Sequence, residues 1–421
     1  MNGWHRLHPL SPAVRAGRGL IAVGFIFVPT LVSGGTSKSD VVWHVFAVCA
    51  LIVLGVVSWL VTRWRIDGND LRIETGLLRR SSLRYPLSQV QAIDTVRPGI
   101  ARALGLAELR LRMGGTGGAA RLAYLPVVQA NELRARLLAL SQGAHEQTPE
   151  PDDRELVRVP TGRIAASLVL SAPAVVLVVY VIALGVSASV DPRLARVFAG
   201  ATLPFLIGGI VALWRRFNRA FNATVAEAPE GLRMRAGLVE TTAETIPRGR
   251  VQAVQLVEPL LWRPLGWCRL DVDVAGRVHD HNDAGRGKRR LRTILPVGTH
   301  AEAAQLLALL VPGAPPAERR PPRRARWKSP LRYRHLSFGF DERYAVATGG
   351  RVARIASWVP LTKVQSLRRI EGPVQRRLGL ATVYLDTAGR SFGAAFRDLD
   401  GGDSRTALDR LTELARAARR R

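Results

Sequence analysis

A stretch of sequence that occurs three times limits the fold of this chain more than any other feature. The copies span 85–113, 246–274 and 359–387, and they align without an internal gap on a proline. Each copy has Val-Gln four and five residues after this proline, and Leu-Gly eighteen and nineteen residues after it. The aligned residues, which we call the repeat signature, are Pro86, Val90, Gln91, Leu104, Gly105, Pro247, Val251, Gln252, Leu265, Gly266, Pro360, Val364, Gln365, Leu378 and Gly379. The copies start 161 and 113 residues apart, far beyond the period of stacked repeat arrays, so we expect three separate domains of one kind.

The chain is strongly basic, with a formal net charge of +28 at pH 7. Such a balance favours contact with a polyanion, either a nucleic acid or an anionic membrane surface. The apolar residues are concentrated in a few long runs, and this concentration favours the membrane. The two cysteines, Cys49 and Cys268, are too few for a disulfide framework and lack the spacing of metal ligands.

Four apolar runs are long enough to cross about 30 Å of hydrocarbon as helices. The runs are 19–37, 41–62, 164–190 and 197–214, and none contains Asp, Glu, Lys or Arg. Short links join them in pairs, which predicts two transmembrane helical hairpins, hairpin 1 over 19–62 and hairpin 2 over 164–214. Proline within the runs is compatible with membrane helices.

Arginine is concentrated at the open ends of both hairpins. The open ends carry Arg6, Arg15, Arg18, Arg63, Arg65, Arg154, Arg158, Arg163, Arg215, Arg216 and Arg219. The closed ends carry Lys38 in hairpin 1 and Arg193 with Arg196 in hairpin 2. Because positive residues are retained in the cytoplasm, this bias predicts a multi-pass protein with its N-terminus, all three repeats and its C-terminus in the cytoplasm.

Each repeat has the pattern of a small α+β domain. Short alternating stretches come first, glycine-bearing turns follow, and an amphipathic stretch ends each copy. Strands followed by one helix predict a bent sheet sandwich with the helix closing one end. The expected segments are 1–18 (N-terminal), 19–62 (hairpin 1), 63–142 (domain 1), 143–163 (linker), 164–214 (hairpin 2), 215–311 (domain 2), 312–330 (Pro/Arg-rich linker) and 331–421 (domain 3).

Membrane hairpins that lead into β-rich repeats with a P-x-x-x-V-Q strand, a second proline and an L-G pair resemble the bacterial pleckstrin-homology-like membrane proteins of the YdbS/YdbT type. Three copies with two hairpins are similar to the longer, YdbT-like members. The resemblance implies a PH-like β-sandwich or barrel for each repeat, a place in the bacterial cytoplasmic membrane and no known enzymatic activity. It also implies a link to envelope stress and to resistance against membrane-active peptides. The third copy departs from this pattern, because it lacks a hairpin and its second proline, Pro373, is shifted by one position.

The three signature glutamines admit two interpretations. They either read a ligand, or lie half-buried and bond the backbone near a strand bend. The second is favoured, because a recurrent ligand contact needs matched charged neighbours, whereas Gln89, Arg250 and Lys363 differ in type. The signature glycines are expected to meet a demand for close approach or positive φ. We therefore interpret the repeat signature as structural.

Two loops contain residue types found in zinc or phosphate sites, but neither has the full motif of such a site. His279, Asp280, His281 and Asp283 are residue types that bind zinc. They lie in a glycine-rich insertion that the other copies lack, so a solvated loop tip is favoured. The glycines of 114–118 are followed by neither Gly-Lys-Ser/Thr nor a helix, which excludes a phosphate cradle. The sequence thus offers no catalytic, cofactor-binding or metal-binding residue.

The segment 312–334 has many prolines, and between Glu318 and Arg334 it has eight basic residues and one acidic residue. The prolines favour an extended chain. A solvated spacer and a contact with the anionic cytoplasmic leaflet explain this composition equally well. Nucleic-acid contact is disfavoured because no recognisable module accompanies the segment. The candidate contacts with anionic lipid are Arg319, Arg320, Arg323, Arg324, Arg326, Trp327 and Lys328.

These observations favour a non-enzymatic membrane protein whose domains act as an interaction scaffold. Its partners would be anionic lipid and other proteins, or further copies of itself. A component of a transport or export system is the alternative. It is disfavoured because the runs lack the charged residues of most polar pathways, and His44 is their lone ionisable side chain.

Overall fold

The structure is a computed structural model. It describes residues 4–6, 8–11, nine positions between 42 and 60, and 61–420 except 68–69, 77–80, 98, 114–119, 142–153, 191, 229–230, 275–291 and 389–392. The chain divides into two compact units. Unit 1 comprises 1–152 with 238–245, and unit 2 comprises 153–237 with 246–421. Hairpin 1 lies for the most part outside the described residues.

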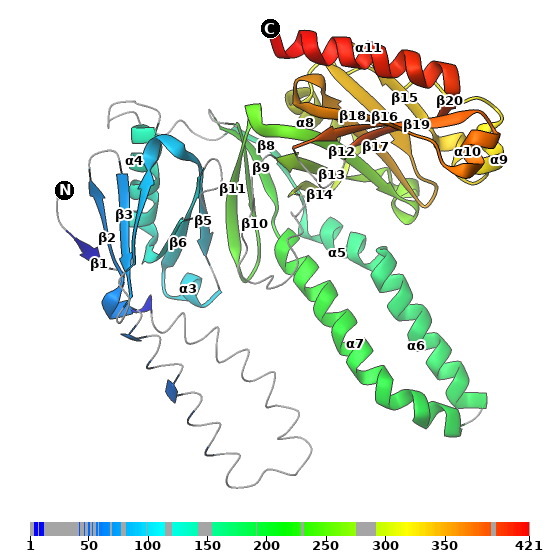
Figure 1. Cartoon of the computed structure of the whole chain (residues 1–421). Helices are drawn as coiled ribbons and strands as arrows, with labels where there is room; N and C mark the ends of the chain where they lie inside the picture. The colour runs from blue at the N-terminus through cyan, green and yellow to red at the C-terminus, as the bar shows by residue number, and fades with distance from the viewer. Residues whose placement is uncertain are drawn as a thin grey trace. The chain divides into compact units, whose positions relative to one another are not determined.

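Each repeat consists of two antiparallel sheets followed by one helix (Figure 1). The strands of the first sheets are β2 (Arg63–Asp67), β3 (Asp70–Thr75) and β4 (Ser81–Pro86); β9 (Thr224–Ala228), β10 (Gly231–Ala236) and β11 (Thr241–Pro247); and β15 (Ser337–Phe340), β16 (Tyr344–Gly349) and β17 (Ala353–Pro360). The strands of the second sheets are β5 (Val90–Arg97), β6 (Leu106–Met113) and β7 (Ala120–Pro126); β12 (Val251–Pro259), β13 (Trp267–Val274) and β14 (Arg292–Thr299); and β18 (Val364–Ile370), β19 (Leu380–Thr387) and β20 (Ala394–Asp400). The closing helices are α4 (Val127–Ser141), α8 (His300–Leu310) and α11 (Gly401–Arg420). The predicted α+β class is confirmed.

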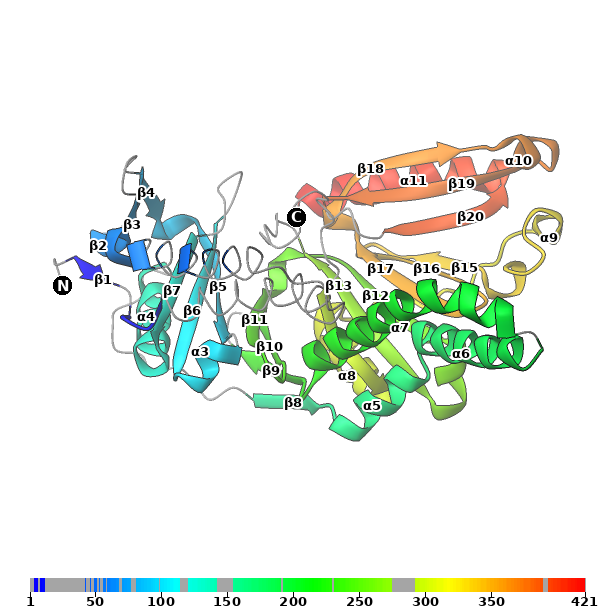
Figure 2. The ribbon, with the colours of Figure 1, turned by 90° about the horizontal axis from the view of Figure 1, so that it is seen from below.

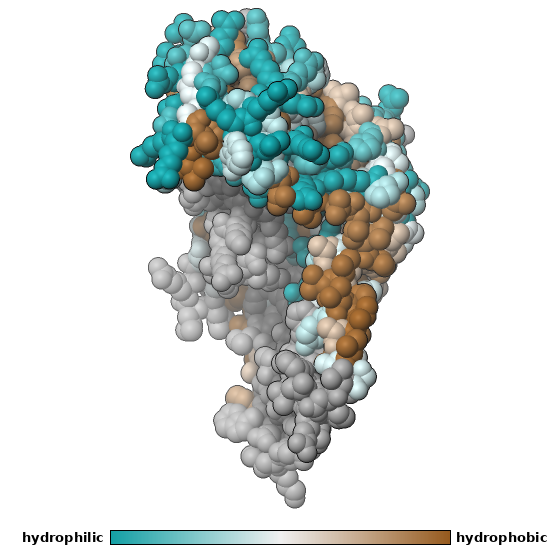
Figure 3. All heavy atoms as spheres, turned by 90° about the vertical axis from the view of Figure 1, so that its right-hand side faces the viewer, coloured by the Kyte–Doolittle hydropathy of each residue, from teal (hydrophilic) through white to brown (hydrophobic). Residues whose placement is uncertain are grey.

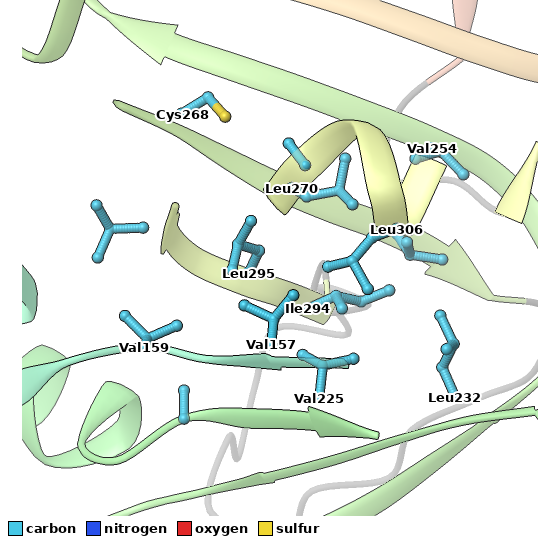
Figure 4. Packing of buried hydrophobic residues seen from close by; sticks show 14 of the residues in the cluster. Val157, Val159, Val225, Leu232, Val254, Cys268, Leu270, Ile294, Leu295 and Leu306 are labelled. Carbon is cyan, nitrogen blue, oxygen red and sulfur yellow. The ribbon is translucent and has the colours of Figure 1, made fainter. Parts of the chain in front are cut away.

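The core of repeat 2 lies between its two sheets and α8. Val225 and Leu232 come from the first sheet, Leu270 and Ile294 from the second, and Leu306 from α8, and none is more than 3% exposed. Figure 4 shows these side chains pointing toward one another. Complete burial of each such side chain contributes about 1.5–3 kcal/mol, so this cluster explains why alternating strands and an amphipathic helix fold together.

The repeat signature lies at the corner between the two sheets. Each signature proline ends a strand and precedes a short 3₁₀ turn, which is η1 (Leu87–Gln89), η2 (Arg248–Arg250) or η5 (Leu361–Lys363). The following strand starts at the signature valine, and its ladder skips the signature glutamine in all three copies, which is a β-bulge. Gly105, Gly266 and Gly379 have φ of 66°, 64° and 62°. Glycine adopts this conformation without steric cost, so the signature specifies a bent strand and a tight turn.

Repeats 2 and 3 share one sheet, which corrects the expectation of separate domains. β12 pairs antiparallel with β17 from Val254 opposite Trp358 to Pro259 opposite Ala353. The sheet therefore runs β14-β13-β12-β17-β16-β15 across both repeats, and Figure 2 shows β12 beside β17. The spacing of the copies along the chain could not reveal this, because the joint forms between the edges of strands far apart in sequence.

The chain enters the first sheet of each repeat in the same way. A segment just before the repeat pairs with the first strand: β1 (His5–Arg6) with β2, β8 (Arg154–Arg158) with β9, and a single bridge with β15. The equivalent pairs are His5–Trp64, Val157–Val225 and Arg319–Phe338, and each second member lies 22 residues before its signature proline. The hairpins therefore stand at the position that 320–336 occupies in repeat 3.

The first predicted span of hairpin 2 is bent rather than straight. Its two parts are α5 (Thr161–Val169) and α6 (Ala172–Val190), and they meet at an angle of 50°. Pro173 accounts for the break, because it cannot donate to the carbonyl of Val169 and its ring would clash with that carbonyl. The helix restarts with Val175 N donating to Ser171 O at 3.0 Å. The return helix α7 (Pro192–Ala220) continues through Pro204.

Candidate interaction surfaces

The base of hairpin 2 is built into the core of repeat 2. Ile164 on α5 is 1% exposed and belongs to the same cluster as Ala223 and Val225. Phe217 and Ala220 at the end of α7 pack against this cluster. Both ends of the hairpin thus continue into the domain without a flexible link.

An ion pair adds a second attachment. Arg163 Nη1 on α5 donates to both carboxylate oxygens of Glu302 on α8, at 2.9 Å and 2.6 Å. Glu302 also caps its own helix, because its Oε2 accepts from Thr299 N at 2.8 Å. Burial acts to raise the pKa of Glu302, but the hydrogen bonds from Arg163 and Thr299 outweigh it, so the pKa lies below its ordinary value.

Beyond this base, the hairpin exposes apolar side chains. Residues at least 47% exposed are Val176, Val178, Val179, Val181, Ile182, Val186, Ile207, Ile210 and Trp214. Figure 3 shows an apolar stretch along the hairpin below a largely polar domain surface. In the described part of the chain no single helix has the length and apolar character of a membrane span, whereas the bent pair α5–α6 meets that test. An apolar surface of this extent is typical of lipid or partner contact.

The Pro/Arg-rich segment packs against repeat 3. Arg319 pairs with Phe338 through the backbone, and its guanidinium lies 5.3 Å from the ring centroid of Phe340. The segment then forms the short helix α9 (Ala325–Lys328). Arg324 forms an ion pair with Asp400. These contacts show a docked segment rather than a free spacer.

Asp398 is the centre of this docking. It is 2% exposed and forms an ion pair with Lys328. It also accepts a hydrogen bond from Ser329 Oγ at 3.0 Å and one from Gln375 Nε2 at 2.7 Å. Its φ is 57°, a conformation that Asp tolerates better than most residues. A buried carboxylate is stable only with such partners, so Asp398 couples the segment to the body of the domain.

The seven candidate lipid contacts therefore separate into two groups. Arg319, Arg324 and Lys328 are engaged in contacts with repeat 3. Arg320, Arg323 and Arg326 are exposed, and Trp327 is 78% exposed. The second group remains available for a surface contact.

A second group of basic residues meets where repeats 2 and 3 join, and sequence reasoning missed it. Arg263 comes from η3 (Leu260–Leu265), and its Nη2 donates to the carbonyl of Arg351 at 2.6 Å. Burial, followed by the charges of Arg354, Arg263, Arg351 and Arg334, holds the pKa of His335 below its ordinary value. We call Arg263, Arg334, His335, Arg351 and Arg354 the basic cluster. Clusters of positive charge of this kind attract anionic surfaces.

The signature glutamines do not form a shared site. Gln252 is 5% exposed, and its Nε2 lies 3.4 Å from the carbonyl of Arg250, as expected for a side chain bonding backbone near a bend. Gln365 is exposed, so the same expectation is wrong there, because no strand covers the outer edge of β18 among the described residues. The side chain of Gln91 lies outside the described residues.

Metal chemistry has no support among the described residues, which contain no group of three or more His, Cys, Asp or Glu side chains arranged to hold an ion. The loop with His279, Asp280, His281 and Asp283 and the glycines of 114–118 lie outside the described residues. Burial raises the pKa of Cys268 to about 12, with smaller contributions from Glu258 and Glu302. This thiol is therefore unreactive at neutral pH.

Comparison with known proteins gives one result. A family model described as a bacterial PH domain matches the chain over residues 20–141, 167–297 and 290–407. The first two matches start within the predicted hairpins, and the third includes the Pro/Arg-rich segment. No curated protein and no solved structure matches significantly.

Proposed function

Because the chain belongs to the bacterial PH domain family, we propose that it is a non-enzymatic multi-pass protein of the cytoplasmic membrane. Its three domains act as an interaction scaffold on the cytoplasmic surface. The observation that carries the proposal is hairpin 2, whose exposed apolar side chains extend from a base that shares the core of repeat 2.

The rigid base matters for this role. A helix joined to a domain by a flexible linker anchors the domain but leaves its orientation free. Here Ile164 lies in the domain core, and Arg163 is held by Glu302. A hairpin embedded in lipid would therefore fix the orientation of repeat 2, and repeat 3 would follow because the two share a sheet.

Positive charge on unit 2 supports the proposal that the domains lie on the cytoplasmic membrane surface. The basic cluster and the exposed arginines of 320–326 provide cations on unit 2 that an anionic leaflet attracts. A domain held at the membrane with its sheet edges exposed is suited to bind partners. By its family resemblance, the proposed setting is envelope stress or resistance to membrane-active peptides.

A charge placed in the hairpin tests the anchor. Ile182 on α6 is 60% exposed, and an arginine near the centre of a membrane helix costs about 2.5–3.5 kcal/mol. We expect Ile182→Arg to lower the fraction of the chain that resists alkaline extraction from membranes, while Ile182→Leu leaves it unchanged. Release of the wild-type chain by alkali would contradict the membrane anchor.

The orientation is tested in a Cys49→Ala background, where the remaining thiol, Cys268, is buried and unreactive. We expect Ser189→Cys at the end of α6 to react with an impermeant maleimide in intact cells. Glu413→Cys on α11 is expected to react only after lysis.

The physiological setting is tested by killing assays with a cationic membrane-active peptide, in which a deletion strain is rescued by the wild type but not by Ile182→Arg.

A further inference from the structure

The joint between repeats 2 and 3 has a defined register. Leu256, nine residues after Pro247, faces Ala356, four residues before Pro360. The ladder continues in the same phase to Glu258, which faces Arg354. The second sheet of one repeat is thus extended by the first sheet of the next.

The same register occurs a second time, within unit 1. Thr95, nine residues after Pro86, faces Ala243, four residues before Pro247. The strand segment around Ala243 belongs to repeat 2 by sequence and to unit 1 by its contacts. Two strand pairs that share little sequence therefore adopt one register relative to the signature prolines. The register is a property of the repeat rather than of one particular joint.

Three repeats with two such joints leave two unused edges. β18 of repeat 3 is the terminal strand of the sheet β18-β19-β20, and β4 of repeat 1 is the terminal strand of β1-β2-β3-β4. Among the described residues nothing pairs with either outer edge. Ile370 on β18 is 44% exposed, whereas Val96 and Val257 at the same position of the other repeats are 2% and 6% exposed.

The edge of β4 shows the matching difference. Leu83 is 50% exposed, whereas Ser357 at the same position of β17 is 4% exposed and accepts a hydrogen bond from Gln255 Nε2 at 3.1 Å. Open edges normally carry protection against pairing. The arginines of β18 are already engaged, since Arg368 Nη2 donates to Asp386 Oδ1 at 2.9 Å and Arg369 Nε donates to Ser404 Oγ at 2.8 Å.

We propose that β18 of one chain pairs with β4 of a second copy, in the register of the two internal joints. The occupant is a second copy because in both internal joints the strand that pairs with β5 or β12 belongs to the first sheet of another repeat of this chain. The interface joins unlike surfaces, so each added copy leaves one β18 edge and one β4 edge open unless a ring closes. This deepens the proposed function and rests on it, since it names the partner that the scaffold binds.

The register makes the proposal specific. It places Arg368 opposite Leu83 and Arg369 opposite Ser82, so no arginine directly faces another. Glu371 lies at the position in its repeat that Glu258 holds in the internal joint, where Glu258 faces Arg354. Opposite charges directly across a ladder are favourable.

Disulfide crosslinking in native membranes tests the joint. Two full-length chains with different tags are co-expressed in the Cys49→Ala background, one with Arg368→Cys and the other with Leu83→Cys. Both replaced side chains are at least half exposed, so the fold is expected to persist. Facing residues bring their Cβ atoms within about 5.5 Å, close to the reach of a disulfide. We expect mild oxidation to give a dimer that carries both tags, and the doubly substituted chain to give a ladder of larger species.

Ser366→Cys provides the matched control. It lies on the same exposed strand two residues out of register, where the distance to Leu83→Cys is about 7–8 Å. We expect the in-register pair to form dimers roughly tenfold faster than this control. Equal rates for the two pairs, or no mixed dimer, would overturn the joint. Each chain is also tested by alkaline extraction. A chain that stays in the membrane without crosslinking contradicts the joint alone, whereas a chain released by alkali contradicts the proposed function.

Discussion

Repeats 2 and 3 have the same fold, but they differ in the segment inserted between the residues that precede each repeat and pair with its first strand, and that first strand itself. Repeat 2 carries hairpin 2, and repeat 3 carries the docked segment 320–336. The insertion in repeat 2 exposes valine and isoleucine, whereas that in repeat 3 exposes arginine and Trp327. One position of the repeat therefore accepts either a candidate membrane anchor or a basic surface element.

The difference also shows what each insertion needs. Each insertion is attached to its domain by a carboxylate from a later part of the same repeat. Glu302 holds Arg163 at the base of hairpin 2, and Asp398 holds Lys328 and Ser329 of the docked segment. Glu302 is about one quarter exposed, whereas Asp398 is 2% exposed. The hairpin has apolar packing in addition, so repeat 3 is expected to depend more on its carboxylate.

Asp398→Ala breaks the more buried attachment. It removes the partner of Lys328 and Gln375 and places alanine at a positive φ, so we expect a loss of roughly 3 kcal/mol in the free energy of unfolding. Denaturant unfolding of the full chain in detergent, together with proteolysis within 320–336, measures the effect. Asp398→Asn retains a side chain that tolerates this backbone and should lose less. Asp409→Ala, at an exposed position of α11, is the control. Equal stability of Asp398→Ala and Asp409→Ala would show that the segment does not depend on Asp398.

Glu302→Gln weakens the attachment of hairpin 2 and should have a smaller effect. The change removes the charge that Arg163 binds but keeps an acceptor for the helix cap, so we expect a loss of about 1–2 kcal/mol. Because the pKa of Glu302 is lowered in the folded state, its contribution is present above the unfolded pKa of about 4.3 and is lost as pH falls through the folded pKa. The stability difference between wild type and variant should therefore shrink in acid. A difference independent of pH would mean that the charge of Glu302 is not what stabilises the base. Arg163→Lys tests the geometry at constant charge.

The fold of each repeat has local sequence signals, whereas the contacts between distant segments have none. The repeat signature predicted three related domains, because a proline, a bulged strand and a positive-φ glycine leave a recognisable spacing. The α+β class followed from alternating stretches such as the one with Leu232 and Met234. The docking at Asp398 could not be predicted, since its partners come from two segments, 328–329 and the helical turn at Gln375, that lie far from it in sequence. The basic cluster was missed for the same reason, because Arg263 and Arg351 meet only when two repeats join. Pro173 itself could have predicted the bend, but the continuous apolar run 164–190 was interpreted as one span.

Trp327 tests whether the insertion of repeat 3 contacts lipid. It is 78% exposed beside the exposed residues Arg323 and Arg326. In nanodiscs with anionic brominated lipid, we expect a component of tryptophan quenching that Trp327→Phe removes. Neutralising Arg320, Arg323 and Arg326 together with glutamine should weaken this component several-fold, because each basic residue adds to the attraction of the leaflet. Quenching that is unaffected by Trp327→Phe would favour a solvated surface. Zwitterionic lipid is the matched control.

The smallest expected effect is a change in the pKa of His335, which reports on the basic cluster alone. Burial and the arginines of the basic cluster keep its pKa below the ordinary value. Among the neighbouring charges, that of Arg354 lowers the pKa of His335 most, so Arg354→Gln should raise this pKa in the absence of lipid. An anionic headgroup beside the cluster should raise the pKa of the wild-type histidine in the same direction, and should do so less in Arg354→Gln. Histidine NMR of the full chain in anionic and zwitterionic nanodiscs distinguishes these outcomes. If Arg354→Gln raises the pKa but anionic lipid does not, the cluster is positive yet faces away from the membrane, and the docked segment alone would be the basic contact of repeat 3.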